Sequence, residues 1–262
     1  MGVSIVITSG KGGTGKTTVT AGLGACLAAL GKTVICVDAD VGARNLDLAL
    51  GMSQALTSAR DLLDALRGPD IVETVLTEHP AIRGLSLIPA PLTRGFEELD
   101  TERFAPLIAA LCERADYVLV DCCAGLEQGF RMATGACERA IVVSTAEKPS
   151  LRVASRAAAM LIPDRPMEAG AKMPMLVVNR VNPLMIKGRY ALNIDDIMDA
   201  AGLPLLGLIP EDEMIPAAAH LGLALTLTGG TGAAAAFLRI ARRVTGEQIP
   251  LKRLKRWQIS VS

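Results

Sequence analysis

Short apolar runs alternate with longer Ala- and Leu-rich segments along nearly the whole chain. The short runs are rich in Val, Ile and Leu, which is typical of strands buried on both faces. They predict strands at residues 3–7, 33–37, 85–89, 117–120, 140–144, 175–179 and 205–209. Between them the pattern predicts helices, including residues 18–30, residues 101–114 and one that begins near Ser150. We therefore expect an α/β fold: a mostly parallel, twisted sheet with helices on both faces, in three α/β/α layers.

Composition narrows this picture. Half of the 262 residues are hydrophobic but only 3% are aromatic, so a large core is possible and must be aliphatic. Lys plus Arg and Asp plus Glu number 27 each, so the net charge is zero and provides no overall attraction to nucleic acid. No linker divides the chain, which predicts one large domain at residues 1–246 and a short C-terminal tail at 247–262.

Three observations bear on the compartment. No uncharged apolar run reaches about 18 residues, so we expect no transmembrane helix. The N-terminus enters a strand directly, without the basic and apolar regions of a secretory signal. The six cysteines show no C-x-x-C spacing, and several lie in apolar patterns, which favours reduced, buried thiols over disulfides or a zinc site. Together these features favour a cytoplasmic protein.

The first predicted strand leads into a glycine-rich segment that matches G-x-x-x-x-G-K-[ST] at every fixed position. The backbone N–H groups of such a loop hold phosphate oxygens, and the N-terminus of the following helix favours the same anions. We predict ATP or ADP with Mg²⁺ here, with Lys16 at the β- and γ-phosphates and Thr17 on the metal. The alternative is a glycine-rich turn that binds nothing. The predicted phosphate-binding residues are Gly10, Lys11, Gly12, Gly13, Thr14, Gly15, Lys16, Thr17 and Thr18.

Two further predicted strands end in acidic residues. Asp38 and Asp40 point to opposite sides if the strand geometry persists, so that one could face the metal shell and the attacking water. An ordinary Asp-rich turn is the alternative. Asp121 ends a later apolar strand, where a phosphate-loop enzyme places an acid near its metal. Because ligands bind at the C-terminal ends of parallel strands, we expect these acids near the phosphate loop.

The loop carries a second lysine, Lys11, which an ordinary phosphate loop does not need. With both lysines, residues 9–18 resemble the deviant Walker A loop of the MinD/ParA ATPases. Two more stretches look like the switch regions of the MinD branch, the ATPases that position bacterial division sites: D-A-D-V-G-A-R-N-L-D at 38–47 and A-G-L-E-Q-G-F at 124–130. The resemblance covers nearly the whole chain, and the second switch is its most specific part. It implies a P-loop NTPase fold, hydrolysis of ATP to ADP and phosphate, and an ATP-dependent homodimer.

The resemblance also implies roles for individual residues. Lys16 and Thr17 hold phosphate and metal, and Lys11 crosses to the nucleotide of the partner subunit. Asp40 orients or activates the attacking water and belongs to the metal surroundings. Asp121 supports Mg²⁺ through a bound water.

Other matching positions belong to the switches and to the base. Asn45 and Glu127 lie in segments that change shape on dimerisation. The adenine is bordered by residues that follow two later strands: Asn179, Arg180, Pro210, Glu211 and Asp212. The chain departs from the family pattern at Cys122-Cys123, where Ser-Pro is usual. It also lacks the acidic residues that often follow the position of Arg152, on a surface that the family uses for its partners.

The C-terminal tail is basic and amphipathic. On a helix, Leu251, Leu254 and Trp257 would share one face. The opposite face would carry four cations: Lys252, Arg253, Lys255 and Arg256. This pattern is typical of a helix that lies in the interface of an anionic membrane, and it resembles the family's membrane-targeting helix. A solvated basic tail is the alternative.

Together, the motifs and the resemblance predict a Mg-ATP-dependent, dimerising ATPase that binds the inner face of the cell membrane reversibly and helps to position the division septum. The expected protein partner is a division inhibitor or a topology factor, and nucleic acid is not expected. The alternatives are a flagellar-number regulator of the same superfamily, a ParA-like DNA-partitioning ATPase, and a scaffold that binds ATP without turnover. Intact Asp40 and Asp121 argue against the last of these.

Overall fold

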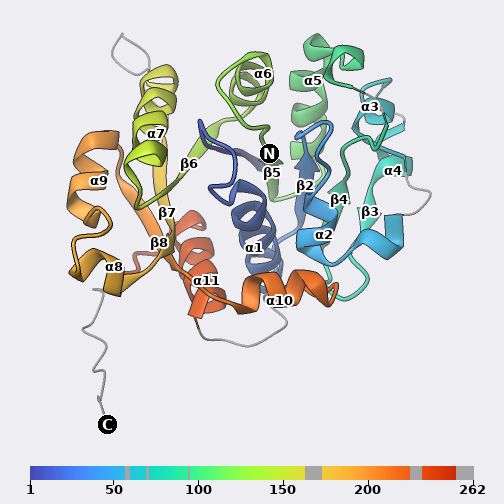
Figure 1. Ribbon diagram of the computed structural model, residues 1–262. Helices are drawn as coiled ribbons and strands as arrows, with labels where there is room; N and C mark the ends of the chain where they lie inside the picture. The colour runs from blue at the N-terminus through green and yellow to red at the C-terminus, as the bar shows by residue number, and fades with distance from the viewer. Residues whose placement is uncertain (57–59, 69–70, 94, 163–172, 225–231, 252–262) are drawn as a thin grey trace.

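The computed structural model of this chain describes residues 1–56, 60–68, 71–93, 95–162, 173–224 and 232–251. Its strands are β1 (Val3–Thr8), β2 (Val34–Asp38), β3 (Thr77–Glu78), β4 (Leu85–Ile88), β5 (Tyr117–Asp121), β6 (Arg139–Thr145), β7 (Met175–Val181) and β8 (Leu205–Pro210). They form one sheet in the order β3-β4-β2-β5-β1-β6-β7-β8 (Figure 1). Every pairing in it is parallel except that of β3 with β4. The predicted, mostly parallel sheet is confirmed, and the two-residue edge strand β3 is the strand that the apolar pattern missed.

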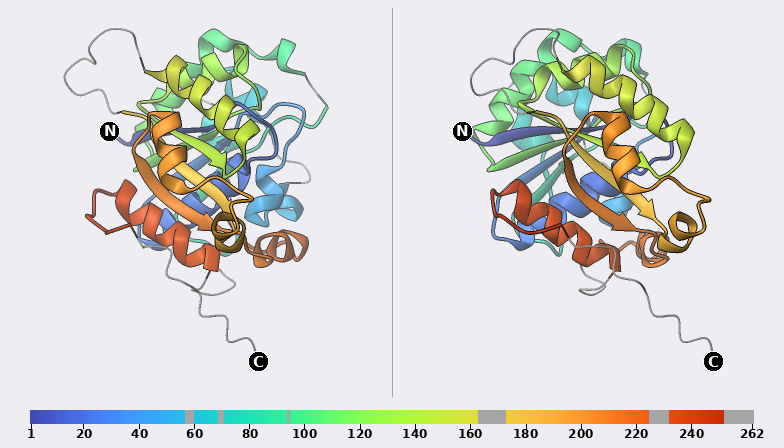
Figure 2. Two further views of the ribbon diagram at one scale, coloured as in Figure 1. Left: turned by 60° about the vertical axis from the view of Figure 1, so that its left-hand side comes forward. Right: turned by 90° about the vertical axis from the view of Figure 1, so that its left-hand side faces the viewer.

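Helices cover both faces of the sheet, which lies between two helical layers in Figure 2. The α-helices are α1 (Lys16–Ala29), α2 (Leu46–Leu50), α3 (Leu62–Ala65), α4 (Val72–Val75), α5 (Thr101–Cys112), α6 (Gln128–Ala136), α7 (Lys148–Leu161), α8 (Pro183–Lys187), α9 (Ile194–Ala201), α10 (Met214–His220) and α11 (Gly232–Val244). Two 3₁₀ turns are η1 (Ser53–Leu56) and η3 (Phe96–Glu98). The predicted three-layer α/β/α fold is therefore confirmed.

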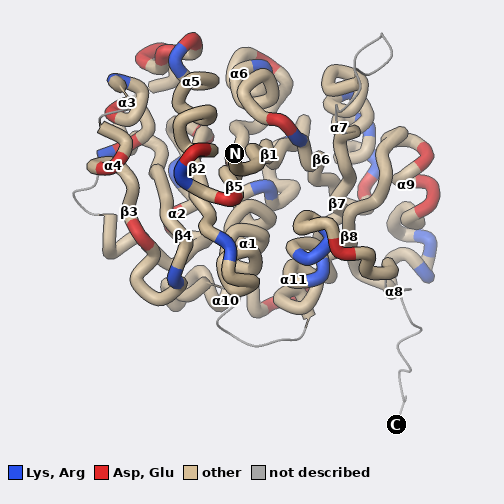
Figure 3. The backbone as a smooth tube through the Cα atoms, turned by 180° about the vertical axis from the view of Figure 1, so that it is seen from behind, with Lys and Arg blue, Asp and Glu red and all other residues tan. Residues whose placement is uncertain are grey.

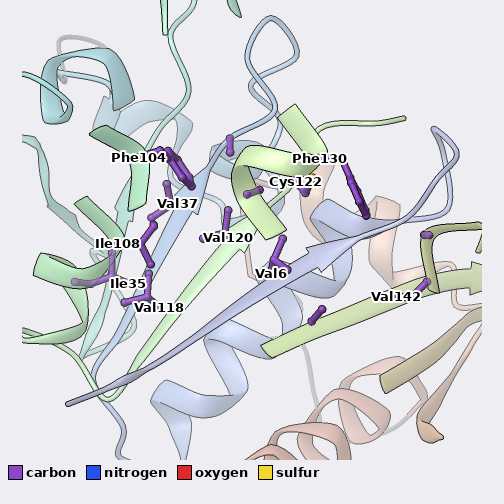
Figure 4. Packing of buried hydrophobic residues seen from close by; sticks show 14 of the residues in the cluster. Val6, Ile35, Val37, Phe104, Ile108, Val118, Val120, Cys122, Phe130 and Val142 are labelled. Atoms are coloured by element: carbon purple, nitrogen blue, oxygen red, sulfur yellow. The ribbon is translucent and has the colours of Figure 1, made fainter. Parts of the chain in front are cut away.

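Two aliphatic cores lie on the two faces of the sheet because successive strand residues point to opposite sides. Val6 packs with the α5, α6 and α7 side, as Figure 4 shows, whereas Ile5 and Ile7 pack with α1 and α11. The approach of α1 to α11 is close: a Cβ on Gly22 would lie 2.7 Å from the ring of Phe237. The core is thus dense on both faces, and it holds the central strands in place for the loops at their ends.

The C-terminal ends of the central strands meet at one edge of the sheet. Asp38 at the end of β2 is in register with Asp121 at the end of β5, and Asp121 is in register with Ile7 of β1. From β1 the chain crosses to β2 on one side, while β6, β7 and β8 extend the sheet on the other side. The chain order reverses beside β1, and open α/β sheets bind their ligands at such a point.

The last described residues remain attached to the domain. The Arg243 guanidinium donates hydrogen bonds to the carbonyl oxygens of Leu206 at 2.8 Å, Ile249 at 2.9 Å and Pro250 at 2.8 Å. Leu251 is 45% exposed, and the other residues predicted to contact a membrane, at 252–257, lie outside the described residues. Among the described helices, none has both the length and the apolar character needed to cross a membrane.

Candidate nucleotide-binding site

The glycine-rich segment forms a compact loop between β1 and α1. Gly13 and Gly15 have φ angles of 77° and 95°, a conformation that residues with a Cβ rarely adopt. The Ser9 hydroxyl donates to the Lys11 carbonyl oxygen at 2.7 Å, and the Thr14 hydroxyl donates to Ser9 Oγ at 2.9 Å. Gly15 is the N-cap of α1, so the loop is held at the positive end of that helix.

Distant elements also hold this loop. A Cβ on Gly10 would lie 2.1 Å from Val153 Cγ1 of α7, and a Cβ on Gly15 would lie 2.2 Å from Asn179 Nδ2 of β7. Asn179 Nδ2 donates to the Thr14 carbonyl oxygen at 2.9 Å. The side chain of Asn179 is buried, and its Oδ1 has no hydrogen-bond partner among the residues that the structure describes. Asn179 thus offers an unused acceptor directly beside the loop.

The two lysines of the loop lie in different surroundings. Lys16 is 5% exposed, and its charge lowers the pKa values of Asp40 and Asp121, against the larger effect of burial, which raises both. The Lys11 side chain is 44% exposed, and its ammonium lies 3.9 Å from the exposed carboxylate of Glu147. An exposed pair at that distance contributes little to stability. Lys16 therefore belongs to the interior of the site, and Lys11 lies on its outside.

Two buried carboxylates lie side by side at the sheet edge. Asp121 accepts a hydrogen bond from the Thr20 hydroxyl at 3.3 Å through Oδ1, while its buried Oδ2 has no hydrogen-bond partner within the described part of the chain. Burial raises the pKa of Asp121 to about 7, although the Thr17 hydroxyl and Lys16 both lower it. Burial and the Asp121 charge raise the pKa of Asp38 as well. Two buried acids this close favour a cation between or beside them.

The structure separates the roles of Asp38 and Asp40. The prediction that Asp38 and Asp40 point to opposite sides was wrong, because residues two apart in a strand share one face. Strand β2 in any case ends at Asp38, so strand geometry does not position Asp40. Asp38 is buried, and its carboxylate accepts the backbone N–H groups of Asp40 at 3.0 Å and Leu46 at 3.2 Å. The Asp38 carboxylate therefore holds together the two ends of the segment 40–46. Asp40 is half-buried; burial raises its pKa, and the charge of Lys16 lowers it.

Two contacts at the acidic edge were not predicted from the sequence. The role of Asp38 was left open, although its place at the end of a buried strand is a usable signal. Thr20 was not singled out; its spacing of four residues from Lys16 places it one turn along the same face of α1. The Thr20 hydroxyl donates to the Lys16 carbonyl oxygen at 3.0 Å as well as to Asp121.

The predicted switch residues and base-contacting residues are mostly exposed. Asn45 and Glu127 are exposed, as are Arg180, which has a φ of 53°, and Glu211, which accepts a hydrogen bond from a neighbouring asparagine at 3.1 Å. Asp212 differs: its two oxygens accept the N–H groups of Met214 and Ala233, which hold the first turns of α10 and α11. Of the five residues predicted around the base, Asn179 is the one with a hydrogen bond to the phosphate loop among the described contacts.

A glycine loop after a central parallel strand, a buried lysine beneath it and carboxylates at the ends of β2 and β5 define a P-loop nucleoside triphosphatase. Residues 5–225 match the CobQ/CobB/MinD/ParA nucleotide binding domain. The chain is 38% identical over 247 residues to the septum site-determining protein MinD of Synechocystis, covering 94% of this chain and 90% of that protein. The chain belongs to the MinD family of this class, and it is an ATPase.

Solved structures agree with this assignment. The MinC:MinD cell division protein complex of Aquifex aeolicus contains a chain 36% identical to this one, with a TM-score of 0.84 over 96% of this chain and 98% of that chain. MinD of Pyrococcus horikoshii complexed with Mg-ADP is 28% identical, with a TM-score of 0.79 over 93% of this chain and 96% of that chain. The predicted fold, family and ATPase class are thus confirmed.

Proposed function

We propose that this ATPase is a membrane switch: Mg-ATP joins two chains, the joined tails bind an anionic membrane, and hydrolysis releases them, which helps to position the division septum. The observation that carries the proposal is the contrast between its two loop lysines. Lys16 is buried, whereas Lys11 lies exposed on the same loop and, among the described residues, makes only a weak, exposed ion pair. A cation on the outside of a phosphate site suits a nucleotide in a second chain.

The site residues fit a nucleotide with its metal. Thr17 and Asp121 are the residues that would hold Mg²⁺, and the unpartnered Asp121 Oδ2 is the free acceptor that such a site needs. Mg²⁺, when bound, neutralises charge on the phosphates. Lys16 binds the β- and γ-phosphates, and the loop N–H groups bind the remaining oxygens. Asp40, half-buried beside Lys16, orients the attacking water.

Asn179 lies between the phosphate loop and the expected position of the base. Its Nδ2 donates a hydrogen bond to the Thr14 carbonyl oxygen, and its Oδ1 accepts a hydrogen bond from the exocyclic amino group of adenine. Arg180 and the residues Pro210, Glu211 and Asp212 form the rest of the border around the base. Guanine presents a carbonyl where adenine presents that amino group, so this acceptor selects ATP over GTP.

Relatives support a protein partner of the division-inhibitor kind, since the Aquifex structure is a MinC:MinD complex. A topology factor is the second partner class. The ParA-like alternative needs a basic surface on the domain. On the side seen in Figure 3, Lys and Arg are interspersed with Asp and Glu, which gives that alternative no support.

A dimerisation experiment tests the lysine contrast. Light scattering with a non-hydrolysed ATP analogue and Mg²⁺ should show a dimer for the natural chain and a monomer for Lys11→Ala. The matched control is Glu147→Ala, which removes the exposed ion-pair partner of Lys11 and should leave dimerisation intact. A Lys11→Ala variant that dimerises as fully as the natural chain contradicts the proposal.

Co-sedimentation tests the membrane part. The natural chain should sediment with anionic liposomes in ATP and remain soluble in ADP, because one tail binds weakly and two bind together. Trp257→Glu should abolish sedimentation without affecting dimerisation. Truncation after Leu251 is the cleaner deletion, since truncation after Gly246 would also remove the Ile249 and Pro250 carbonyls that Arg243 binds. Sedimentation of the truncated chain with liposomes would exclude the tail as anchor, and ATP-dependent sedimentation with DNA instead would favour the partitioning alternative.

A further inference from the structure

Two adjacent cysteines follow the acidic end of β5, and neither takes part in the nucleotide chemistry described above. The Cys122 N–H donates to the Ile7 carbonyl oxygen at 3.1 Å, and its side chain is 0% exposed. Figure 4 shows Cys122 in the core below α6, on the same side of the sheet as Phe130. Cys123 is half-buried. The chain therefore presents one partly accessible thiol next to a buried one.

The Cys123 sulfur is packed against the start of α6. A Cβ on Gly129 would lie 2.4 Å from Cys123 Sγ and 3.2 Å from the ring of Phe96. There is no free space on that side of the sulfur, so a group attached to it must displace either the first turn of α6 or the segment 124–127 that leads into it. That segment contains Gly125, whose φ of 97° places it in the left-handed region.

Such a displacement reaches the phosphate site directly. A Cβ on Gly12 of the phosphate loop would be 3.9 Å from the Cβ of Ala124, the residue after Cys123. On its other side, the cysteine pair adjoins Asp121, whose Oδ2 has no hydrogen-bond partner among the described residues. The thiols therefore lie between the loop that holds the phosphates and the second predicted switch.

Chain geometry decides which chemistry the pair suits. Consecutive Cα atoms are about 3.8 Å apart across a trans peptide, whereas disulfide-bonded cysteines usually have Cα atoms about 4.4–6.8 Å apart, so a direct Cys122–Cys123 disulfide is strained. A single soft atom that bonds to both sulfurs spans a longer distance and avoids this strain, and thiolates prefer such soft centres.

We propose that Cys122 and Cys123 form a dithiol site for soft, three-coordinate thiophilic ligands, the class that trivalent arsenicals represent, and that occupation of this site disables the adjacent nucleotide site. With an organic arsenic(III) oxide, two As–S bonds form. The As=O oxygen leaves as water with the two thiol protons, and arsenic stays trivalent, so no oxidant is required.

The probe is phenylarsine oxide added to the full, reduced chain. We expect one arsenical to bind per chain with the loss of two free thiols, both mapped to Cys122 and Cys123 by peptide mass spectrometry. Affinity for a fluorescent ATP analogue should fall by at least about tenfold. Saturating Mg-ATP should slow the reaction, and a small dithiol, but not a monothiol, should restore nucleotide binding.

Matched variants separate this pair from the other thiols. Cys123→Ser should bind nucleotide like the natural chain and lose its sensitivity to the arsenical. Cys112→Ser is the control, because Cys112 and Cys137 form a second close pair beside Ser4, and this variant should keep full sensitivity. The inference is overturned if Cys123→Ser stays fully sensitive, if Cys112→Ser becomes insensitive, or if the arsenical caps Cys122 and Cys123 without weakening nucleotide binding. The inference uses the proposed nucleotide site as its readout, but the stoichiometry and the mapped thiols report on the dithiol site even if that proposal fails.

Discussion

Replacing Gly15 by alanine tests whether the phosphate loop is held by both its own backbone and a distant side chain. Gly15 has a φ of 95°, and the added Cβ would lie 2.2 Å from Asn179 Nδ2. No real Cβ approaches a nitrogen so closely, so Asn179 must turn away. That movement breaks its hydrogen bond to the Thr14 carbonyl oxygen.

Two contributions set the expected loss of stability in Gly15→Ala. Holding an alanine in the left-handed region costs about 1–2 kcal/mol. Losing the Asn179 hydrogen bond costs about 0.5–1.5 kcal/mol more. The sum, about 1.5–3.5 kcal/mol, corresponds to a fall in melting temperature of about 3–14 °C for a domain of this size. Nucleotide binding should also be lost, because the loop N–H groups move.

The assay is thermal unfolding without nucleotide, followed by titration with a fluorescent ATP analogue. Gly13→Ala is the matched control: Gly13 has a φ of 77°, but its added Cβ would meet nothing within 4 Å. It should therefore show the backbone contribution alone, about 1–2 kcal/mol. In the double variant Gly15→Ala/Asn179→Ala, the two substitutions should cost about 1 kcal/mol less than their sum, since the hydrogen bond is lost only once.

Two results would refute this reasoning. If Gly15→Ala melts no lower than Gly13→Ala, the contact with Asn179 contributes nothing. If the costs of Gly15→Ala and Asn179→Ala add fully, the two residues are not coupled, and Asn179 does not hold the loop.

Three further outcomes follow from the site. Lys16→Ala should retain the fold but lose ATP affinity and turnover in a phosphate-release assay, because the buried cation at the β- and γ-phosphates is removed; unchanged turnover would remove Lys16 from the site. The pKa of Asp121 is about 7 in the folded chain and about 3.9 when unfolded, so the nucleotide-free protein should lose stability as pH rises from about 4 to about 7. Asp121→Asn should weaken this dependence in melts across that range, with the remainder due to Asp38 and Asp40, whose pKa values burial also raises; an unchanged profile would contradict the shift. Arg243→Ala should cost about 2–3 kcal/mol and speed proteolysis near residues 247–251, since three carbonyls lose their donor; Arg243→Lys should recover part of the loss, and identical digestion of all three chains would argue against this anchor.

Features with a local physical cause were accessible from the sequence. The backbone conformation of the glycine-rich loop was predictable because its glycines act through the backbone of consecutive residues, and Gly13 and Gly15 do adopt the left-handed conformation. The parallel sheet was predictable because strands buried on both faces must be continuously apolar. Among the described strands, β3 at the edge is the one that was missed, since two residues carry no periodic signal.

Features that depend on where β2 ends required the tertiary structure. The sequence did not decide which of Asp38 and Asp40 faces the metal, because both lie at the end of the same apolar run. The end of β2 at Asp38 and the hydrogen bond from Leu46 N–H to its carboxylate distinguish them. A strand's end is set by which backbone groups its neighbours can pair, and that information is not local.

The contact of Asn179 with the phosphate loop is the clearest case of what only the folded chain decides. The sequence placed Asn179 near the base through its resemblance to the MinD/ParA family, but Thr14 and Asn179 are 165 residues apart. They meet because β1 and β7 lie on either side of β6 in one parallel sheet, so that their C-terminal ends reach the same edge. The local sequence was therefore enough to identify the residues that could bind a nucleotide. Which distant side chains contact them was decided only by the order of the strands in the sheet.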